Sequence, residues 1–179
     1  VGSWLRTGDF FNVDYAYGRI PDELLPFDYE TYDRERANMP LYAVVTNVDT
    51  GKPEYMDTGD MHKGIAYVRA SASLPFMARI VGVDGKRYLD GGISDSIPVD
   101  AALCHGYDRL IVVLTRPEGY RKEPQSRRML SLLDHVYGRR YPNLVKDMKE
   151  RHEVYNRELD RVDELCREGK AFVLRPSVS

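Results

Sequence analysis

Residues 87–99 read Arg-Tyr-Leu-Asp-Gly-Gly-Ile-Ser-Asp-Ser-Ile-Pro-Val, and this stretch decides how the chain is interpreted. An acid, Asp90, ends a short run of alternating apolar and polar residues, and two glycines follow it directly. Paired glycines permit backbone angles closed to other residues and let a second segment approach closely. Taken alone, the stretch is most simply a loop acid followed by a flexible turn. The alternative is a carboxylate held at the mouth of a site, and the flanking sequence favours it.

Up to residue 117 the hydrophobic pattern alternates between strand and helix. The predicted elements are a strand at 41–48 with a hairpin partner at 53–58, a helix at 63–73, a hairpin at 80–89 around Asp84-Gly85, a helix at 98–105 and a strand at 110–114. The run at 110–114 is wholly apolar, which predicts burial on both faces in a parallel sheet. We expect it to lie beside the strand at 41–48 and expect one side of that sheet to lack its natural cover.

After residue 117 the chain becomes strongly charged. Apolar residues at helical spacing predict a helix around 129–137 and one long amphipathic helix at 141–168, which Gly169 ends before a last strand. Basic residues in these helices are Lys122, Arg127, Arg128, Arg139, Arg140, Lys146, Lys149 and Arg151. Interleaved acids make a solvated face with i,i+4 pairs the simpler interpretation. The alternative is contact with an anionic membrane surface, which predicts weak, salt-sensitive binding to anionic vesicles.

Composition bounds the class of protein. The chain has 179 residues, 42% of them hydrophobic, which suits one globular domain with a core. A net charge of −2 argues against nucleic acid as a partner. Cys104 and Cys166 are far apart and read as reduced thiols, so we expect a cytoplasmic location, with membrane association as an open alternative. Neither cysteines nor histidines have metal-ligand spacing, so no metal and no cofactor is predicted.

Three segments carry a resemblance. Residues 68–76, Val-Arg-Ala-Ser-Ala-Ser-Leu-Pro-Phe, place small residues and a proline before the hairpin that leads to Asp-Gly-Gly and Ile-Pro-Val. Residues 44–55 look like a strand and hairpin before a helix, and residues 109–117 look like the strand that follows a catalytic Asp. In this order and spacing, from Phe10 to Pro176, the chain resembles the second half of bacterial patatin-like phospholipases.

The resemblance implies a fold and a chemistry. The fold would be α/β, a three-layer, mainly parallel sheet, and the activity would be that of a serine esterase or phospholipase of lipid metabolism and degradation. Catalysis would use a Ser-Asp dyad in which Asp90 accepts the serine proton directly, with lipid or another acyl ester as substrate. Gly91, Gly92, Ser73 and Pro75 would shape the site.

The chain departs from the family at the nucleophile. Neither a glycine-rich oxyanion loop nor G-x-S-x-G occurs, and residues 92–96, Gly-Ile-Ser-Asp-Ser, lack the last glycine. We therefore expect residues 1–179 to be the C-terminal portion of a single domain whose nucleophile half is missing, inactive alone. Its parts would be a cap of loops and short helices at 1–38, the sheet with Asp-Gly-Gly at 39–117, and charged helices with a last strand at 118–179. Self-association through the incomplete sheet would follow.

Other functions of the chain remain open as alternatives. The chain could be a non-catalytic patatin-like scaffold, a membrane- or partner-binding module, or an unrelated α/β binding domain. Asp95 and Asp100 are interpreted as a loop acid and a helix-start acid. Ser71 and Ser73 are interpreted as small residues that let a helix pack closely. The histidines belong to no motif; they are His62, His105, His135 and His152.

Overall fold

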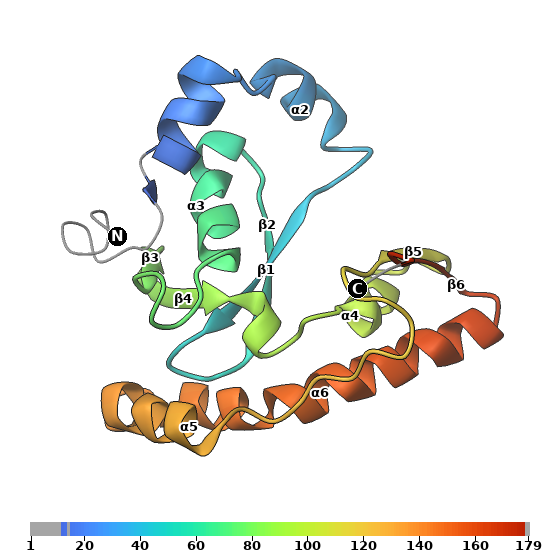
Figure 1. Ribbon diagram of the computed structural model, residues 1–179. Coiled ribbons are helices and arrows are strands. Elements are labelled where there is room, and N and C mark those ends of the chain that lie inside the picture. Colours follow the sequence, from blue (N-terminus) through green and yellow to red (C-terminus); the bar gives the residue numbers. More distant parts are fainter. Residues whose placement is uncertain (1–11, 14, 178–179) are drawn as a thin grey trace. The chain divides into compact units, whose positions relative to one another are not determined.

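The computed structural model describes residues 12–13 and 15–177 (Figure 1). The chain divides into two compact units, Val1–Ile93 and Ser94–Ser179, and each is described by itself. Residues 1–11 and 14 of the predicted cap lie outside the described residues. The rest of residues 12–38 contains the π-helical segment η1 (Tyr15–Leu24) and the short helix α2 (Tyr29–Glu35), in agreement with the predicted short helices.

The first unit contains a four-stranded antiparallel sheet in the order β2-β1-β4-β3. Its strands are β1 (Tyr42–Asn47), β2 (Pro53–Asp57), β3 (Val81–Val83) and β4 (Lys86–Asp90). Asp84 and Gly85 join β3 to β4 with φ of 49° and 76°. Positive φ at both central residues is the type I′ pattern that suits a two-residue hairpin, so the predicted hairpin is confirmed.

Helix α3 (Met61–Ser71) packs on this sheet and contacts β1, β3 and β4. It begins where the carboxylate of Asp60 accepts a bond from the His62 backbone N–H at 3.0 Å. Ala70 packs there with Val45, Val81 and Tyr88 in a buried cluster. The single turn η2 (Gly91–Ile93) follows β4 directly and contacts β1 and α3. The end of β4 is therefore surrounded by regular structure.

The second unit is built on one long helix. Its elements are α4 (Val99–Cys104), β5 (Leu110–Val113), α5 (Arg127–Leu133), the π-helical turn η3 (Asp134–Gly138), α6 (Pro142–Arg167) and β6 (Ala171–Leu174). Gly169 has φ 71°, Lys170 N–H donates to Leu165 O at 2.9 Å, and Gly169 N–H donates to Cys166 O at 3.0 Å. These bonds form a Schellman motif, which confirms the predicted end of the helix.

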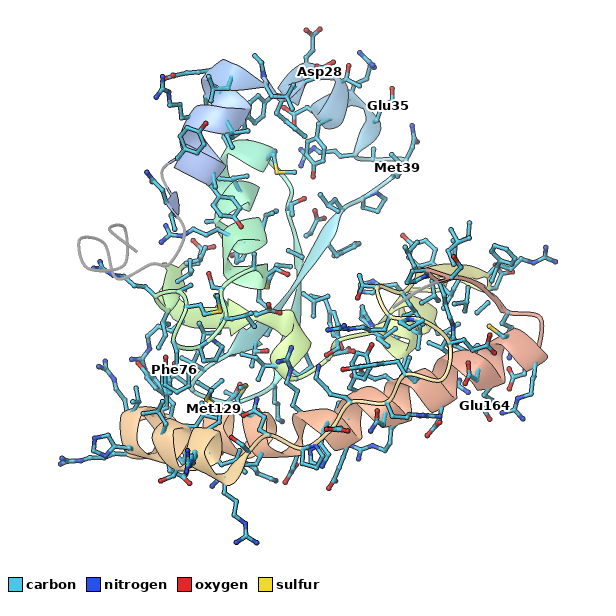
Figure 2. All side chains as sticks on the ribbon, in the orientation of Figure 1. Asp28, Glu35, Met39, Phe76, Met129 and Glu164 are labelled. Atoms are coloured by element: carbon cyan, nitrogen blue, oxygen red, sulfur yellow. The ribbon has the colours of Figure 1, made fainter. Side chains whose placement is uncertain are left out.

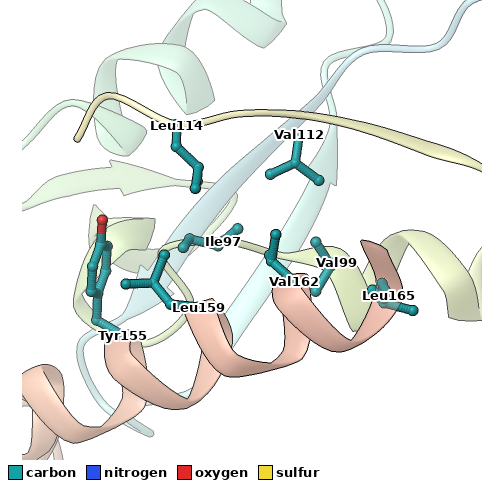
Figure 3. Packing of buried hydrophobic residues seen from close by; sticks show 8 residues of the cluster. All are labelled: Ile97, Val99, Val112, Leu114, Tyr155, Leu159, Val162 and Leu165. Carbon is teal, nitrogen blue, oxygen red and sulfur yellow. The ribbon is translucent and has the colours of Figure 1, made fainter. Parts of the chain in front are cut away.

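The core of the second unit lies between α6, β5 and the segment that enters α4 (Figure 3). Its buried residues are Ile97, Val99, Val112, Leu114, Tyr155, Leu159, Val162 and Leu165. The four members on α6 are separated by three or four positions, as one face of a helix requires. The amphipathic stripe predicted from the sequence is therefore the packing face of α6.

The mixed α/β fold is confirmed, but two predictions about its sheets are wrong. The larger sheet is antiparallel rather than parallel, and β5 pairs in parallel only with β6, in a sheet separate from β1. Burial of β5 on both faces is also wrong, because Ile111 and Val113 are 74% and 70% exposed while Val112 is buried. Alternation along the strand turns Ile111 and Val113 to an open face of the two-stranded sheet, whereas the shared sheet with β1, for which an uncovered side was predicted, does not form.

Among the described residues, no helix combines the length and apolar character needed to cross a bilayer.

Candidate functional site

The backbone of Asp90 is held from two sides at the end of β4. Its N–H donates to the carbonyl of Ser73, just beyond α3, at 2.8 Å. Its own carbonyl accepts from the hydroxyl of the fully buried Thr46 on β1, also at 2.8 Å. In the sheet Asp90 lies opposite Val45. Strand β1 and the end of α3 therefore fix the backbone of Asp90, from which its half-buried carboxylate projects.

Both glycines after Asp90 have a defined role. Gly91 is buried, and a Cβ built on it would lie 2.2 Å from the Val44 carbonyl oxygen, so no larger residue fits without a shift of the backbone. The Gly92 N–H donates to Asp90 Oδ1 at 2.7 Å. This bond closes a short turn on the side chain and orients the carboxylate. Asp-Gly-Gly thus forms a turn with a side-chain hydrogen bond and a close backbone contact to β1.

The structure brings Ser73 to Asp90 as a structural neighbour. Ser73 is 4% exposed, and its hydroxyl donates to the Arg69 carbonyl at 2.8 Å. Because the hydroxyl satisfies the end of α3 and the carbonyl binds Asp90, this serine fixes the junction of the two segments. Pro75 is buried two residues later, and Phe76 follows with φ 67°. These hydrogen bonds give Ser73 a structural role at the end of α3.

A cavity of about 260 Å³ opens beside this junction. Its lining residues are Val13, Ala16, Tyr17, Arg69, Ala72, Ser73, Met77 and Ala78. Burial raises the pKa of the Tyr17 hydroxyl; the nearby Arg69 charge lowers it and the Asp90 charge raises it. The hollow is lined by residues of η1, of the end of α3 and of the loop that follows it, and Asp90 lies close enough for its charge to act on the Tyr17 hydroxyl. Hollows lined mainly by apolar side chains with a few polar groups are a common form of small-molecule site.

The sequence interpretation missed Tyr17 and Arg69. Arg69 belongs to the segment 68–76 but fits no catalytic motif by itself. Tyr17 lies more than fifty positions from Arg69 in the chain, and no spacing rule links a π-helical segment to the end of a distant helix. A cluster of aromatic residues before residue 38 was the one available signal.

In the second unit, the acids that follow Asp-Gly-Gly meet different environments. Asp100 is exposed in the first turn of α4 and pairs with Arg161 at 3.0 Å, as expected of a helix-start acid. Asp95 is half-buried and lies near Glu158, a residue that the sequence interpretation did not single out. The Ser96 and Ile97 N–H groups donate to the Glu158 carboxylate at 3.2 and 3.0 Å. Helix α6 thus holds the segment that enters α4.

The raised pKa of Glu158 predicts that the free energy of unfolding depends on pH. Burial first, and then the Asp95 charge, raises its pKa to about 7, although the two N–H groups act in the opposite direction. Between the ordinary glutamate pKa of 4.5 and about 7, the folded chain binds more protons at this site than the unfolded chain. The free energy of unfolding should therefore fall as the pH rises through this window.

The test is denaturant unfolding of wild type and Glu158→Gln across this window. The neutral glutamine removes the titration, so the stability of the variant should fall less steeply with pH. Some slope will remain, because burial also raises the pKa of Asp147, to about 6. Parallel curves for wild type and variant would contradict the assignment.

The histidines do not form a second centre among the described residues. His62 stacks on Tyr29 with ring centroids 4.0 Å apart, and the ring of His152 bonds the Lys149 carbonyl oxygen at 3.1 Å. In the part of the chain that the structure describes, no three acidic, histidine or cysteine side chains gather as metal ligands would.

Comparison with known proteins identifies the family. Residues 2–103 match the patatin-like phospholipases, more than half of the chain and including Asp-Gly-Gly. Residues 141–179 match a domain of unknown function, DUF6363. The uncharacterized protein YjjU of Escherichia coli (strain K12) is 36% identical over 124 residues, which are 68% of this chain and 34% of that protein. The chain thus spans about a third of the length of this curated relative. The chain belongs to the patatin-like phospholipase family.

Proposed function

We propose that this chain supplies the carboxylate base of a serine hydrolase that cleaves acyl esters of lipids. The observation that carries the proposal is the setting of Asp90: a carboxylate oriented by Gly92 N–H, beside a backbone approach that only glycine permits at position 91. Membership of the patatin-like phospholipases supports a lipid substrate. The serine and the oxyanion donors would come from residues outside positions 1–179.

In this mechanism Asp90 acts on the serine hydroxyl directly. The carboxylate takes the proton as the serine oxygen attacks the acyl carbonyl, and it returns the proton to the leaving alcohol as the tetrahedral intermediate collapses. Water then repeats the sequence on the acyl-enzyme. A base that moves protons in this way must stay in one orientation, which the bond from Gly92 provides. The cavity lined by Met77 and Ala78 would receive the acyl chain.

We also propose further structural features that are typical of the patatin-like family. The three-layer arrangement is proposed for the whole protein only, since the described strands form two separate sheets. Gly91, Gly92, Ser73 and Pro75 are proposed as site-shaping residues because they fix the backbone around Asp90. A cytoplasmic location and self-association through the open face of β5–β6 remain predictions from the sequence.

A second candidate function is a non-catalytic scaffold or a partner-binding module. It is favoured by one observation: residues 1–179 contain neither G-x-S-x-G nor a glycine-rich oxyanion loop. A protein that kept the fold around Asp90 without these motifs would bind acyl ligands and leave them intact.

One experiment separates the two candidates. A longer protein that joins a G-x-S-x-G segment to this chain should hydrolyse p-nitrophenyl butyrate and should be labelled by a fluorophosphonate. Residues 1–179 alone should do neither, because the nucleophile and the oxyanion donors are absent. Acyl-ester binding by the longer protein without hydrolysis or labelling would favour the scaffold, and hydrolysis by residues 1–179 alone would contradict the proposed dyad.

A further inference from the structure

We propose that α5 and η3 form a docking element for anionic phospholipid surfaces. The element consists of an apolar stripe, Met129, Leu132 and Val136, and of four arginines at its ends, Arg127, Arg128, Arg139 and Arg140. This inference goes beyond the proposed hydrolysis and does not depend on Asp90. A protein that docked here would be held at a lipid surface whether or not it cleaved lipids.

The apolar stripe is exposed although its helix is anchored. Met129, Leu132 and Val136 are 41%, 46% and 50% exposed (Met129 is labelled in Figure 2). Their spacings of three and four positions put them on one side of the helix. Leu133, which is fully buried, turns to a neighbouring face and anchors α5 in the structure. The apolar face predicted at 129–137 is thus divided: one part packs inward and the other part is free to contact a partner.

The charges around the stripe have one sign. Arg127 and Arg128 precede it, Arg139 and Arg140 follow it, and all four are exposed. The one acid within residues 127–140 is Asp134. Both of its carboxylate oxygens accept from Lys149 Nζ, at 2.8 and 3.0 Å. The local acid is therefore neutralised from α6, and the positive charge of the arginines is not offset within the element.

This arrangement fits a phospholipid surface better than a second copy of the chain. Interfacial helices carry an apolar stripe that enters the acyl region and arginines that meet phosphate groups. Each basic residue close to an anionic membrane adds to the electrostatic attraction. A symmetric dimer through the same face would bring arginine clusters together, because both partners use the same patch in such contacts. Like charges at that interface would oppose association.

The test is cosedimentation of the full 179-residue chain with vesicles. Phosphatidylcholine vesicles with and without phosphatidylglycerol are compared, at low and at high salt. We expect binding to the phosphatidylglycerol vesicles at low salt and weaker binding at high salt, because salt screens the arginine–phosphate attraction. Binding to pure phosphatidylcholine should be at least roughly tenfold weaker, since the electrostatic contribution is then missing.

Two double variants test the arginines and the apolar stripe separately. Arg128→Gln with Arg139→Gln should weaken binding roughly tenfold and reduce its salt dependence. Leu132→Ser with Val136→Ser should weaken binding as well but leave the salt dependence unchanged, because the arginines remain. The matched control is Arg157→Gln with Lys170→Gln, which removes two exposed charges of the second unit away from the stripe and should bind like wild type.

Three results would overturn the proposal: no binding to anionic vesicles at low salt, binding that the docking variants leave unchanged, or equal loss of binding in the control variant. Binding to polyglutamate but not to vesicles would assign the surface to an acidic protein instead. Asp90→Asn should bind vesicles like wild type, so a failure of the docking proposal is distinguishable from a failure of the proposed hydrolysis. Circular dichroism of each variant checks that the fold is retained.

Discussion

Replacing Asp90 by asparagine in the longer protein should lower hydrolysis of a short-chain p-nitrophenyl ester by about 10²–10⁴-fold, the usual cost of losing a general base. Asparagine keeps the size of the side chain and can still accept the bond that Gly92 N–H donates to Oδ1 at 2.7 Å. It cannot take a proton from the serine. The loss should therefore appear in kcat, with the fold and KM little changed.

The neighbouring acids provide the controls. Asp95→Asn and Asp100→Asn should keep most of the activity, because Asp95 lies near Glu158 and Asp100 pairs with Arg161. Kinetics of all three variants, with thermal melts to verify folding, decide the assignment. If Asp90→Asn were folded and nearly as active as wild type, Asp90 would not be the base and Asp-Gly-Gly would be a structural turn.

Replacing Gly91 by alanine should be the most destabilising small substitution at the site. A Cβ at this position would lie 2.2 Å from the Val44 carbonyl oxygen and 2.7 Å from its Cγ1. The first of these atoms is backbone within the sheet, so β1 and the turn after β4 must separate. Overpacking of this kind costs about 3 kcal/mol at the upper end of the usual range. For a chain of this size the midpoint of thermal unfolding should fall by about 6–12 °C.

Gly82→Ala is the matched control for that substitution. Gly82 lies in β3, whereas Gly91 lies in the turn after β4, and the nearest atom to a Cβ at Gly82 would be the Lys86 carbonyl oxygen at 4.0 Å, an ordinary contact. Its melting temperature should stay near that of wild type, since exposed substitutions without such a clash usually change stability by less than about 0.5 kcal/mol. Equal melting temperatures for the Gly91 and Gly82 variants would show that the backbone at Asp-Gly-Gly yields easily.

The local features of this fold could be predicted from the sequence because short-range chemistry determines them. Asp84-Gly85 specifies a tight hairpin, since both residues tolerate positive φ. Gly169 ends the long helix because it takes the left-handed conformation that the Schellman motif needs. The apolar spacing from Leu144 to Leu165 matches the buried face of α6. The order of motifs around Asp90 was also sufficient to suggest the family that residues 2–103 match.

The tertiary structure alone decided which distant groups meet. The apolar sequence of β5 determined neither its partner strand nor its burial: β5 pairs with β6 rather than with β1, and one of its faces is exposed. Tyr17 and Arg69 line one hollow, and the Glu158 carboxylate accepts a hydrogen bond from the Ser96 N–H. The residues of each pair are about fifty to sixty positions apart in the chain. Such contacts depend on how whole elements pack, because the chain between them can follow many paths at little difference in local energy. The sequence could therefore indicate Asp90, whereas its surroundings followed from the packing of η1, α3 and the sheet.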